Sequence, residues 1–271
     1  MSSRRRRSGS APSTGPFPID TGTASFDPVP GDPAAFVLTV NGVPSSPYAP
    51  ADPGRLDFEY MRWLIAGIDS GLPVTSRPTL RALHVGGAAC ALPRRIAADR
   101  PGSRQTVAEV DAALATWVRA HLDLPRSPAV AIRAAEGGAE LARQREDSLD
   151  LVVRDAFSGD VTPPQLQSPE WFASAARALG AHGLYCANVA DTAGRAALRA
   201  EAEGLRGCFP HLAAITGGGR LAGRAHGNVV VLAAHAPLDP ADIARRARAE
   251  GCAVPTVHGR RTLLRACGLS G

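Results

Sequence analysis

Residues 83–94 of the chain read LHVGGAACALPR. An apolar run ends at Gly86 and Gly87, and a segment typical of a helix follows. Glycines between a strand and a helix let the backbone approach a ligand closely, and the next helix offers free N–H groups. The strict G-x-G-x-x-G pattern is absent. The stretch therefore predicts a strand, a turn and a helix, and it is equally consistent with a nucleotide loop or a simple tight turn.

Short apolar segments alternate with helical segments from residue 80 onward. Near-continuous apolar strands between helices predict a parallel sheet covered on both faces. Strands are expected at residues 81–87, 105–110, 129–135, 149–155, 183–190, 212–216 and 227–234. Helices are expected at residues 90–99, 111–122, 137–146, 168–181, 192–206 and 239–250. The last two strands are joined by a glycine-rich connection and should form an antiparallel pair at one edge, so we predict a seven-stranded, mostly parallel sheet.

A smaller β domain is expected at residues 17–55, which are rich in Pro, Gly, Asp and Ser. It contains a clear strand at 35–42 that ends in Asn41-Gly42, a hairpin signal. The TASF segment at 23–26 is its expected partner. Residues 56–271 form the second predicted domain, which starts with an amphipathic helix at 56–69.

The first 16 residues are expected to be a disordered, arginine-rich tail. Four of the five net positive charges lie at Arg4–Arg7, so the rest of the chain is near neutral. We therefore expect no nucleic-acid partner, and no apolar run is long enough to span a membrane. Five cysteines without a C-x-x-C spacing and seven histidines without ligand spacing predict no metal site and a reducing, cytoplasmic location.

Ligands of open α/β sheets bind beyond the carboxyl ends of the strands. Glu109 ends the second strand, 23 residues after Gly86, where an acid takes two hydrogen bonds from ribose hydroxyls. Asp111 is a candidate helix cap. Glu136 follows the third strand, where a carboxylate either accepts from an adenine amino group or caps the next helix. These residues predict a nucleoside site.

Asp155 ends the fourth strand, at the centre of the sheet. A carboxylate there faces the cleft, where it is placed to accept a proton from an amine or to hold a cation. Asp160 lies in the same loop. Asn188 and Asp191 end the fifth strand, where turn chemistry is the favoured interpretation. Since the chain has no lysine, Schiff-base chemistry is excluded.

The order of these motifs resembles the spermidine synthase (polyamine aminopropyltransferase) family, in particular its divergent actinobacterial branch. The resemblance rests on five stretches within residues 17–240: VLTVNGVPSSPY…DPGRLDFEYMRWL, LHVGGAACALPR, SRQTVAEVDAAL, DLVVRDAFSGDVTPPQLQSPEWF and GLYCANVAD. It implies a class I S-adenosylmethionine-methyltransferase-like Rossmann fold after a small β domain. It also implies aminopropyl transfer from decarboxylated S-adenosylmethionine to a small-molecule amine, without a metal, in a homodimer.

By this resemblance, Gly86 and Gly87 lie in the nucleoside loop and Glu109 takes the ribose hydroxyls. Glu136 stands where the family binds adenine. Asp155 matches the first acid of the family's D-x-x-D loop, and Tyr60 matches a tyrosine of the aminopropyl pocket.

The chain departs from the family where the acceptor amine would bind. The second acid of D-x-x-D is Ser158, so Asp160 replaces it only if the loop is rearranged. The acid of the glycine loop is absent, and the family's His-Glu after Tyr60 is Met61-Arg62. A diamine needs carboxylates to replace its lost hydration, so efficient putrescine transfer is not expected.

Two alternatives to aminopropyl transfer stay open. One is an S-adenosylmethionine-dependent methyltransferase acting on an unknown acceptor, with Arg94 or Arg62 assisting the methionine carboxylate. The other is a non-catalytic nucleoside-binding homologue. The acceptor and the role of the arginine tail are not defined by the sequence.

Overall fold

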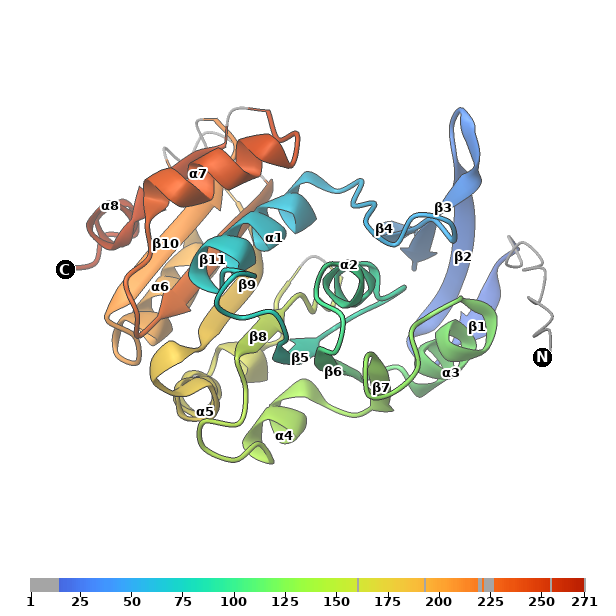
Figure 1. Ribbon diagram of the computed structural model, residues 1–271, viewed down its shortest axis with the longest axis horizontal. Helices are drawn as coiled ribbons and strands as arrows, with labels where there is room; N and C mark the ends of the chain where they lie inside the picture. Colours follow the sequence, from blue (N-terminus) through green and yellow to red (C-terminus); the bar gives the residue numbers. More distant parts are fainter. Residues whose placement is uncertain are drawn as a thin grey trace.

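The computed structural model describes residues 15–159, 161–192, 194–218, 221, 227–253 and 255–270. It contains a small antiparallel sheet and a larger α/β unit (Figure 1). The expected tail lies outside the described residues except for Gly15 and Pro16. Among the described helices, none has the length and apolar character needed to cross a membrane.

The larger sheet has eight strands in the order β12-β10-β11-β9-β8-β5-β6-β7. Its strands are β5 (Arg81–Val85), β6 (Arg104–Glu109), β7 (Ala131–Ala134), β8 (Leu151–Arg154), β9 (Leu184–Asp191), β10 (His211–Thr216), β11 (Gly227–Ala234) and β12 (Thr256–Gly259). The five strands from β9 to β7 are parallel, and β11, β10 and β12 join antiparallel. The predicted class of fold is confirmed, with β12 as one strand beyond the seven expected.

Helices cover both faces of this sheet (Figure 1). They are α1 (Glu59–Gly71), α2 (Ala91–Asp99), α3 (Ala112–His121), α4 (Gly137–Ala142), α5 (Pro169–Leu179), α6 (Ala196–Arg206), α7 (Pro240–Ala249) and α8 (Arg260–Ala266), with short 3-10 turns η1 (Pro164–Gln167) and η2 (Gly180–His182). One apolar cluster joins α1, α2 and α7 to the sheet, and another joins α4, α5, α6 and α8. Burial on both faces explains why the β9 sequence LYCANVAD is almost continuously buried.

The N-terminal sheet has four strands in the order β1 (Phe17–Ile19), β2 (Gly22–Val29), β3 (Asp32–Val40) and β4 (Val43–Tyr48). The expected pairing of β2 with β3 is present, with Ala24 opposite Val40. Asn41 and Gly42 both have positive φ, which the hairpin turn between β3 and β4 requires. The sheet extends beyond the predicted hairpin because β1 and β4 each add one antiparallel strand.

Asp111 joins the small sheet to the larger unit. Its carboxylate caps α3 by accepting from the Leu114 N–H at 2.7 Å. It also accepts from the N–H and the hydroxyl of Thr21, both at 2.8 Å, and from the N–H of Asp20 at 3.1 Å. The predicted helix cap is therefore present, and the same side chain holds the β1–β2 turn.

Replacing Asp111 with alanine is expected to lower the free energy of unfolding by about 2 kcal/mol, because a cap and three further bonds are lost together. Urea unfolding measures this change. The matched control is Asp239→Ala. It removes a similar cap from α7, where Asp239 accepts from the Ala241 N–H at 2.9 Å, far along the chain from the small sheet. Equal losses in the two variants would contradict the joining role.

The same variant should change the response to acid. Burial raises the pKa of Asp111, but the donors from Leu114, Thr21 and Asp20 outweigh it and hold the pKa below its ordinary value. The pKa of Asp111 in the folded protein thus lies below its value in the unfolded chain, which is about 3.9. Asp111 therefore stabilises the fold fully above that pH, and this contribution is lost as the pH falls through the folded pKa. Asp111→Ala should lose this part of the acid dependence.

Candidate active site

The ends of five neighbouring strands bring the predicted residues to one edge of the sheet. Across the sheet, β7, β6, β5, β8 and β9 follow one another. At or just beyond the carboxyl ends of the first four lie, in the same order, Glu136, Glu109, Gly86 and Asp155. Asn188 lies within β9, beside the end of β8. The chain direction of the crossovers changes between β5 and β8, the place where open α/β sheets bind ligands.

Asp155 is held by two side chains from different elements. The Tyr60 hydroxyl at the start of α1 donates to Asp155 Oδ2 at 3.0 Å. The Asn188 amide in β9 donates to Asp155 Oδ1 at 2.9 Å. The other amide atom, Asn188 Oδ1, is buried and has no hydrogen-bond partner in the described part of the chain. The carboxylate is therefore oriented, with an unused acceptor oxygen beside it.

The surroundings of Asp155 change its acidity. Burial raises the pKa of Asp155 above its ordinary value, although the donors Asn188 and Tyr60 and the charge of Arg154 oppose this. Burial and the neighbouring Asp155 raise the pKa of Tyr60 well above its usual range. Tyr60 thus stays a hydrogen-bond donor at neutral pH, and Asp155 is a stronger base than an exposed aspartate.

The glycine pair is explained first by the protein's own backbone. Gly86 has φ +79°, and a Cβ there would lie 2.3 Å from the carbonyl oxygen of Asp155. A Cβ on Gly87 would lie 2.4 Å from a methyl group of Val107. Gly86 is therefore required because the loop that carries Asp155 passes directly against it. The tight turn at Gly86 and the position of Asp155 therefore depend on the same close contact.

Glu109 bonds to the same turn. Its carboxylate accepts from the N–H of Asp111 at 3.2 Å and from those of Ala88 and Gly87. Burial nevertheless raises the pKa of Glu109 above its ordinary value. Glu109 lies next to Gly86 across the sheet, because the Gly86 N–H donates to the carbonyl oxygen of Ala108 at 3.0 Å.

Two other predicted residues cap helices. Glu136 is exposed and accepts from the Ala139 N–H at 2.8 Å, so it caps α4. Asp191 accepts from the Leu198 N–H at 3.4 Å, at the start of α6. Asp160 lies outside the described residues. Among the residues that the structure describes, no group of three or more His, Cys, Asp or Glu side chains is placed to hold a metal ion.

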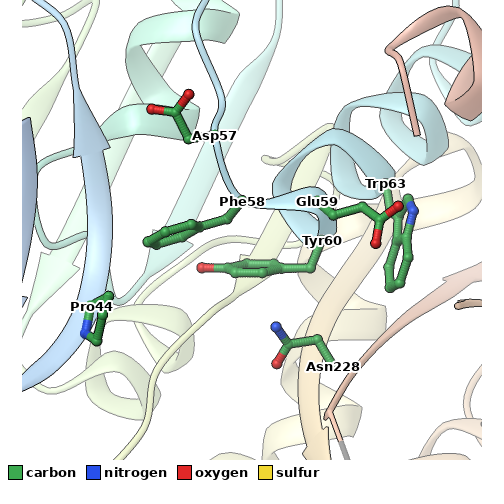
Figure 2. Close-up of a pocket in the computed structure, with 7 residues that line it drawn as sticks. All are labelled: Pro44, Asp57, Phe58, Glu59, Tyr60, Trp63 and Asn228. Carbon is green, nitrogen blue, oxygen red and sulfur yellow. The ribbon is translucent and has the colours of Figure 1, made fainter. Parts of the chain in front are cut away.

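A pocket of about 470 Å³ opens beside Tyr60, whose hydroxyl bonds to Asp155. Its lining is aromatic and acidic, as Figure 2 shows. It is formed by Pro44, Asp57, Phe58, Glu59, Tyr60, Trp63 and Asn228. The rings of Phe58 and Tyr60 stack with centroids 6.1 Å apart. Asp57 pairs with Arg55 at 2.8 Å, whereas Glu59 accepts from the backbone N–H of Ala253 at 3.2 Å.

The two arginines considered for a methionine carboxylate are engaged elsewhere. Arg94 is buried, stacks 4.5 Å from the centre of the Tyr48 ring and donates to the carbonyl oxygen of Ala49 at 2.9 Å. Arg62 lies two residues after Tyr60 on α1, hence on the opposite side of the helix, where it contacts the thiol of Cys252. The expected assistance from Arg94 or Arg62 is therefore not supported by their placement.

Sequence reasoning missed one residue of this edge and undervalued another. Val110 follows Glu109 and is 68% exposed, although it is a large apolar side chain. Its position directly after the predicted ribose acid was the available signal. The turn role predicted for Asn188 is wrong, because Asn188 lies within β9 and its amide donates to Asp155 in the neighbouring strand's loop.

Comparison with known proteins gives structural relatives. No family model matches the chain, and no curated protein matches it in sequence. The chain is 28% identical to a probable spermidine synthase from Corynebacterium glutamicum, with a TM-score of 0.89 over 96% of this chain and 98% of that one. The predicted resemblance to the spermidine synthase family is thus confirmed.

Two more distant structures share the fold alone. The spermidine synthase of Thermotoga maritima is 14% identical, with a TM-score of 0.62 over 94% of this chain and 84% of that one. Human methyltransferase-like protein 13 in complex with SAH is 18% identical, with a TM-score of 0.55 over 79% of this chain and 94% of that one.

Proposed function

We propose that this chain, which shares its fold with spermidine synthases, transfers an aminopropyl group from decarboxylated S-adenosylmethionine to an amine. One observation carries the proposal. Asp155 lies at the centre of the sheet edge, against the Gly86 turn, and is held by Tyr60 and Asn188. An oriented, partly buried carboxylate next to a nucleoside-type turn suits a base that takes a proton from an attacking amine.

The nucleoside half of the site follows from the neighbouring strands. Glu109 accepts hydrogen bonds from the ribose hydroxyls in place of some of its present backbone donors. Val110 and Val161 are 68% and 61% exposed, and they offer apolar surface to a purine ring, since exposed apolar side chains gain by being covered. Glu136 accepts from the adenine amino group at the rim.

The chemistry is a direct displacement. The amine nitrogen forms a bond to the aminopropyl carbon next to the sulfonium sulfur. The bond between that carbon and sulfur breaks, and methylthioadenosine leaves. The proton lost by the amine moves to Asp155. The unpartnered Asn188 Oδ1 takes a second N–H of the amine, and Tyr60 fixes the carboxylate. Positioning and exclusion of water supply most of the rate enhancement.

The aromatic pocket beside Tyr60 suits the rest of the acceptor. Two acids line it, and Arg62 lies on the other side of α1, so the pocket is less depleted of negative charge than the sequence indicates. Because Arg55 neutralises Asp57, Glu59 is the acid with more charge left for a cation. An alkylamine with apolar carbons fits this lining.

Calorimetric titration tests the proposal with decarboxylated S-adenosylmethionine, S-adenosylmethionine and methylthioadenosine in turn. We expect tighter binding of the decarboxylated compound and of methylthioadenosine, because Arg94 and Arg62 are not placed to take a carboxylate. Preference for S-adenosylmethionine would instead favour methyl transfer, the reaction class of the methyltransferase-like protein that shares this fold. If none of the three compounds binds, both aminopropyl transfer and methyl transfer are excluded.

Glu109→Gln is expected to weaken methylthioadenosine binding about 10- to 100-fold, because charge-assisted bonds to the ribose are replaced by weaker ones. The same titration measures the loss. Glu136→Gln is the matched control and should lose less, because Glu136 is exposed and its amide replacement can still cap α4. Equal affinities of Glu109→Gln and the unmodified protein would remove the ribose role.

A further inference from the structure

A buried ion pair lies directly behind Asp155, on the face of the sheet covered by α5 and α6. Arg154 is the last residue of β8, and its Nη2 lies 2.6 Å from Oε2 of Glu201 in α6. Both side chains are 0% exposed. The proposed chemistry does not use this pair, so its presence needs a separate explanation.

The side-chain nitrogens of Arg154 and the carboxylate oxygens of Glu201 all have hydrogen-bond partners. Tyr185 Oη accepts from Arg154 Nε at 3.2 Å and from Trp171 Nε1 at 3.1 Å, and it donates to Glu201 Oε1 at 2.8 Å. Gln167 Nε2 donates to Glu201 Oε2 at 3.0 Å. The network therefore links β8, β9, α5, α6 and the η1 turn through one buried cation.

The network also holds the loop that carries Asp155. Arg154 Nη1 donates to the hydroxyl of Thr162 at 3.0 Å. The loop begins at Asp155, the residue after Arg154, and reaches Thr162 before η1 begins. Arg154 thus precedes the loop in the chain and bonds to Thr162 at its far end.

Core stability alone does not require such a pair. Apolar side chains of similar volume commonly stabilise a core as well as a buried ion pair does. Apolar side chains cannot supply a fixed positive charge where the loop begins. They also cannot donate hydrogen bonds to Tyr185, Thr162 and Glu201 at once, as a guanidinium does. Both properties bear on the carboxylate of Asp155.

We propose that Arg154, held in place by Glu201 and Tyr185, is a positioning residue that fixes the loop carrying Asp155 through Thr162 and places a fixed positive charge behind that loop. The proposal rests on the proposed function only in taking Asp155 as the group that receives the proton. Arg154 itself touches no substrate in this scheme.

The electrostatics of Asp155 agree with this geometry. Tyr60 from α1 and Arg154 from β8 are the titratable or charged groups acting on it, and β9 contributes the neutral Asn188. Burial raises the pKa of Asp155, and the charge of Arg154 opposes that increase. Without this cation, a buried carboxylate would take up a proton at a higher pH.

The test compares Asp155 titration in variants of the full chain. Carboxyl-carbon NMR on protein labelled at aspartate follows Asp155, assigned by its loss in Asp155→Asn. In the double variant Arg154→Met/Glu201→Leu, the pKa of Asp155 should rise, because the cation that opposes the effect of burial is gone. The control Arg100→Met/Asp69→Asn removes another ion pair of a buried arginine, at 2.5 Å, and should leave Asp155 unchanged.

A second pair of variants guards against loss of folding. Arg154→Gln/Glu201→Gln removes both charges while keeping hydrogen-bonding groups, and it should raise the pKa of Asp155 in the same direction. Thr162→Val removes only the loop contact, and hydrogen exchange at the Ser158 amide should become faster. An unchanged Asp155 pKa in a folded charge variant, or unchanged exchange in Thr162→Val, would overturn the proposal.

These readouts do not depend on any acceptor. If Asp155 titrates as expected and no amine is ever transferred, the proposed function fails while the positioning role stands. If transfer occurs and Asp155 does not respond to the charge variants, the positioning role alone fails.

Discussion

Asparagine in place of Asp155 is expected to slow aminopropyl transfer by about 100-fold or more, which is the usual effect of removing a positioned base. Asparagine keeps the shape of the side chain and can accept the bond from Tyr60, but it cannot receive the amine proton. Methylthioadenosine affinity should change little, because the proposed nucleoside contacts are those of Glu109, Val110, Glu136 and Val161. Release of methylthioadenosine in the presence of a panel of amines measures the rate.

The control for this variant is Asp191→Asn. Asp191 is also a buried carboxylate near the end of a strand, and burial raises its pKa as well, but its bonds are to the backbone at the start of α6. The Asp191→Asn variant should transfer the aminopropyl group at the rate of the unmodified protein. If Asp155→Asn retained the rate of the unmodified protein, Asp155 would not be the base, whatever the nucleoside preference.

Asp155 also sets an expected pH dependence. Transfer requires the ionised carboxylate, so the rate should fall as the pH drops through the pKa of Asp155. Because burial raises that pKa, the fall should occur above the pH typical of an exposed aspartate. The same shift means that ionised Asp155 destabilises the fold at neutral pH. Asp155→Asn should therefore melt at a higher temperature than the unmodified protein while losing activity.

The regular part of the fold was predictable because its signals are local. Buried parallel strands give continuous apolar runs, and β5, β8 and β9 were found within a few residues of their bounds. Strands β1, β4 and β12 were missed for a physical reason. They are short or proline-containing edge strands, such as VPSSPY in β4, whose pairing depends on the neighbouring strand rather than on their own sequence.

The site was predictable where strand order alone positions a residue. Gly86, Glu109 and Asp155 lie at the carboxyl ends of three adjacent parallel strands, so the strand order brings them together. Tyr60 came only from the family resemblance, since nothing local indicates that the start of α1 meets the end of β8. The helix rotation that separates Arg62 from Tyr60 and the stacking that engages Arg94 are tertiary properties. For this reason the expected roles of both arginines were not supported.

Alanine in place of Gly86 is expected to have the second large effect, on stability and binding together. The residue has φ +79°, and its new Cβ would meet the carbonyl oxygen of Asp155 at 2.3 Å. Left-handed backbone and a backbone clash together should lower the free energy of unfolding by about 2–4 kcal/mol. Because the clash is with Asp155, relief moves the catalytic loop, and transfer should fall even at temperatures where the variant is folded.

Gly207→Ala is the control, since a Cβ there meets no atom within 4 Å and its φ is −81°. Urea unfolding and calorimetric titration with methylthioadenosine separate the two effects of Gly86→Ala. A variant that loses stability but binds and transfers normally would show that Gly86 serves the turn alone. Loss of binding and transfer in the folded variant is the outcome we expect, because the turn at Gly86 and the carboxylate at Asp155 share one steric contact.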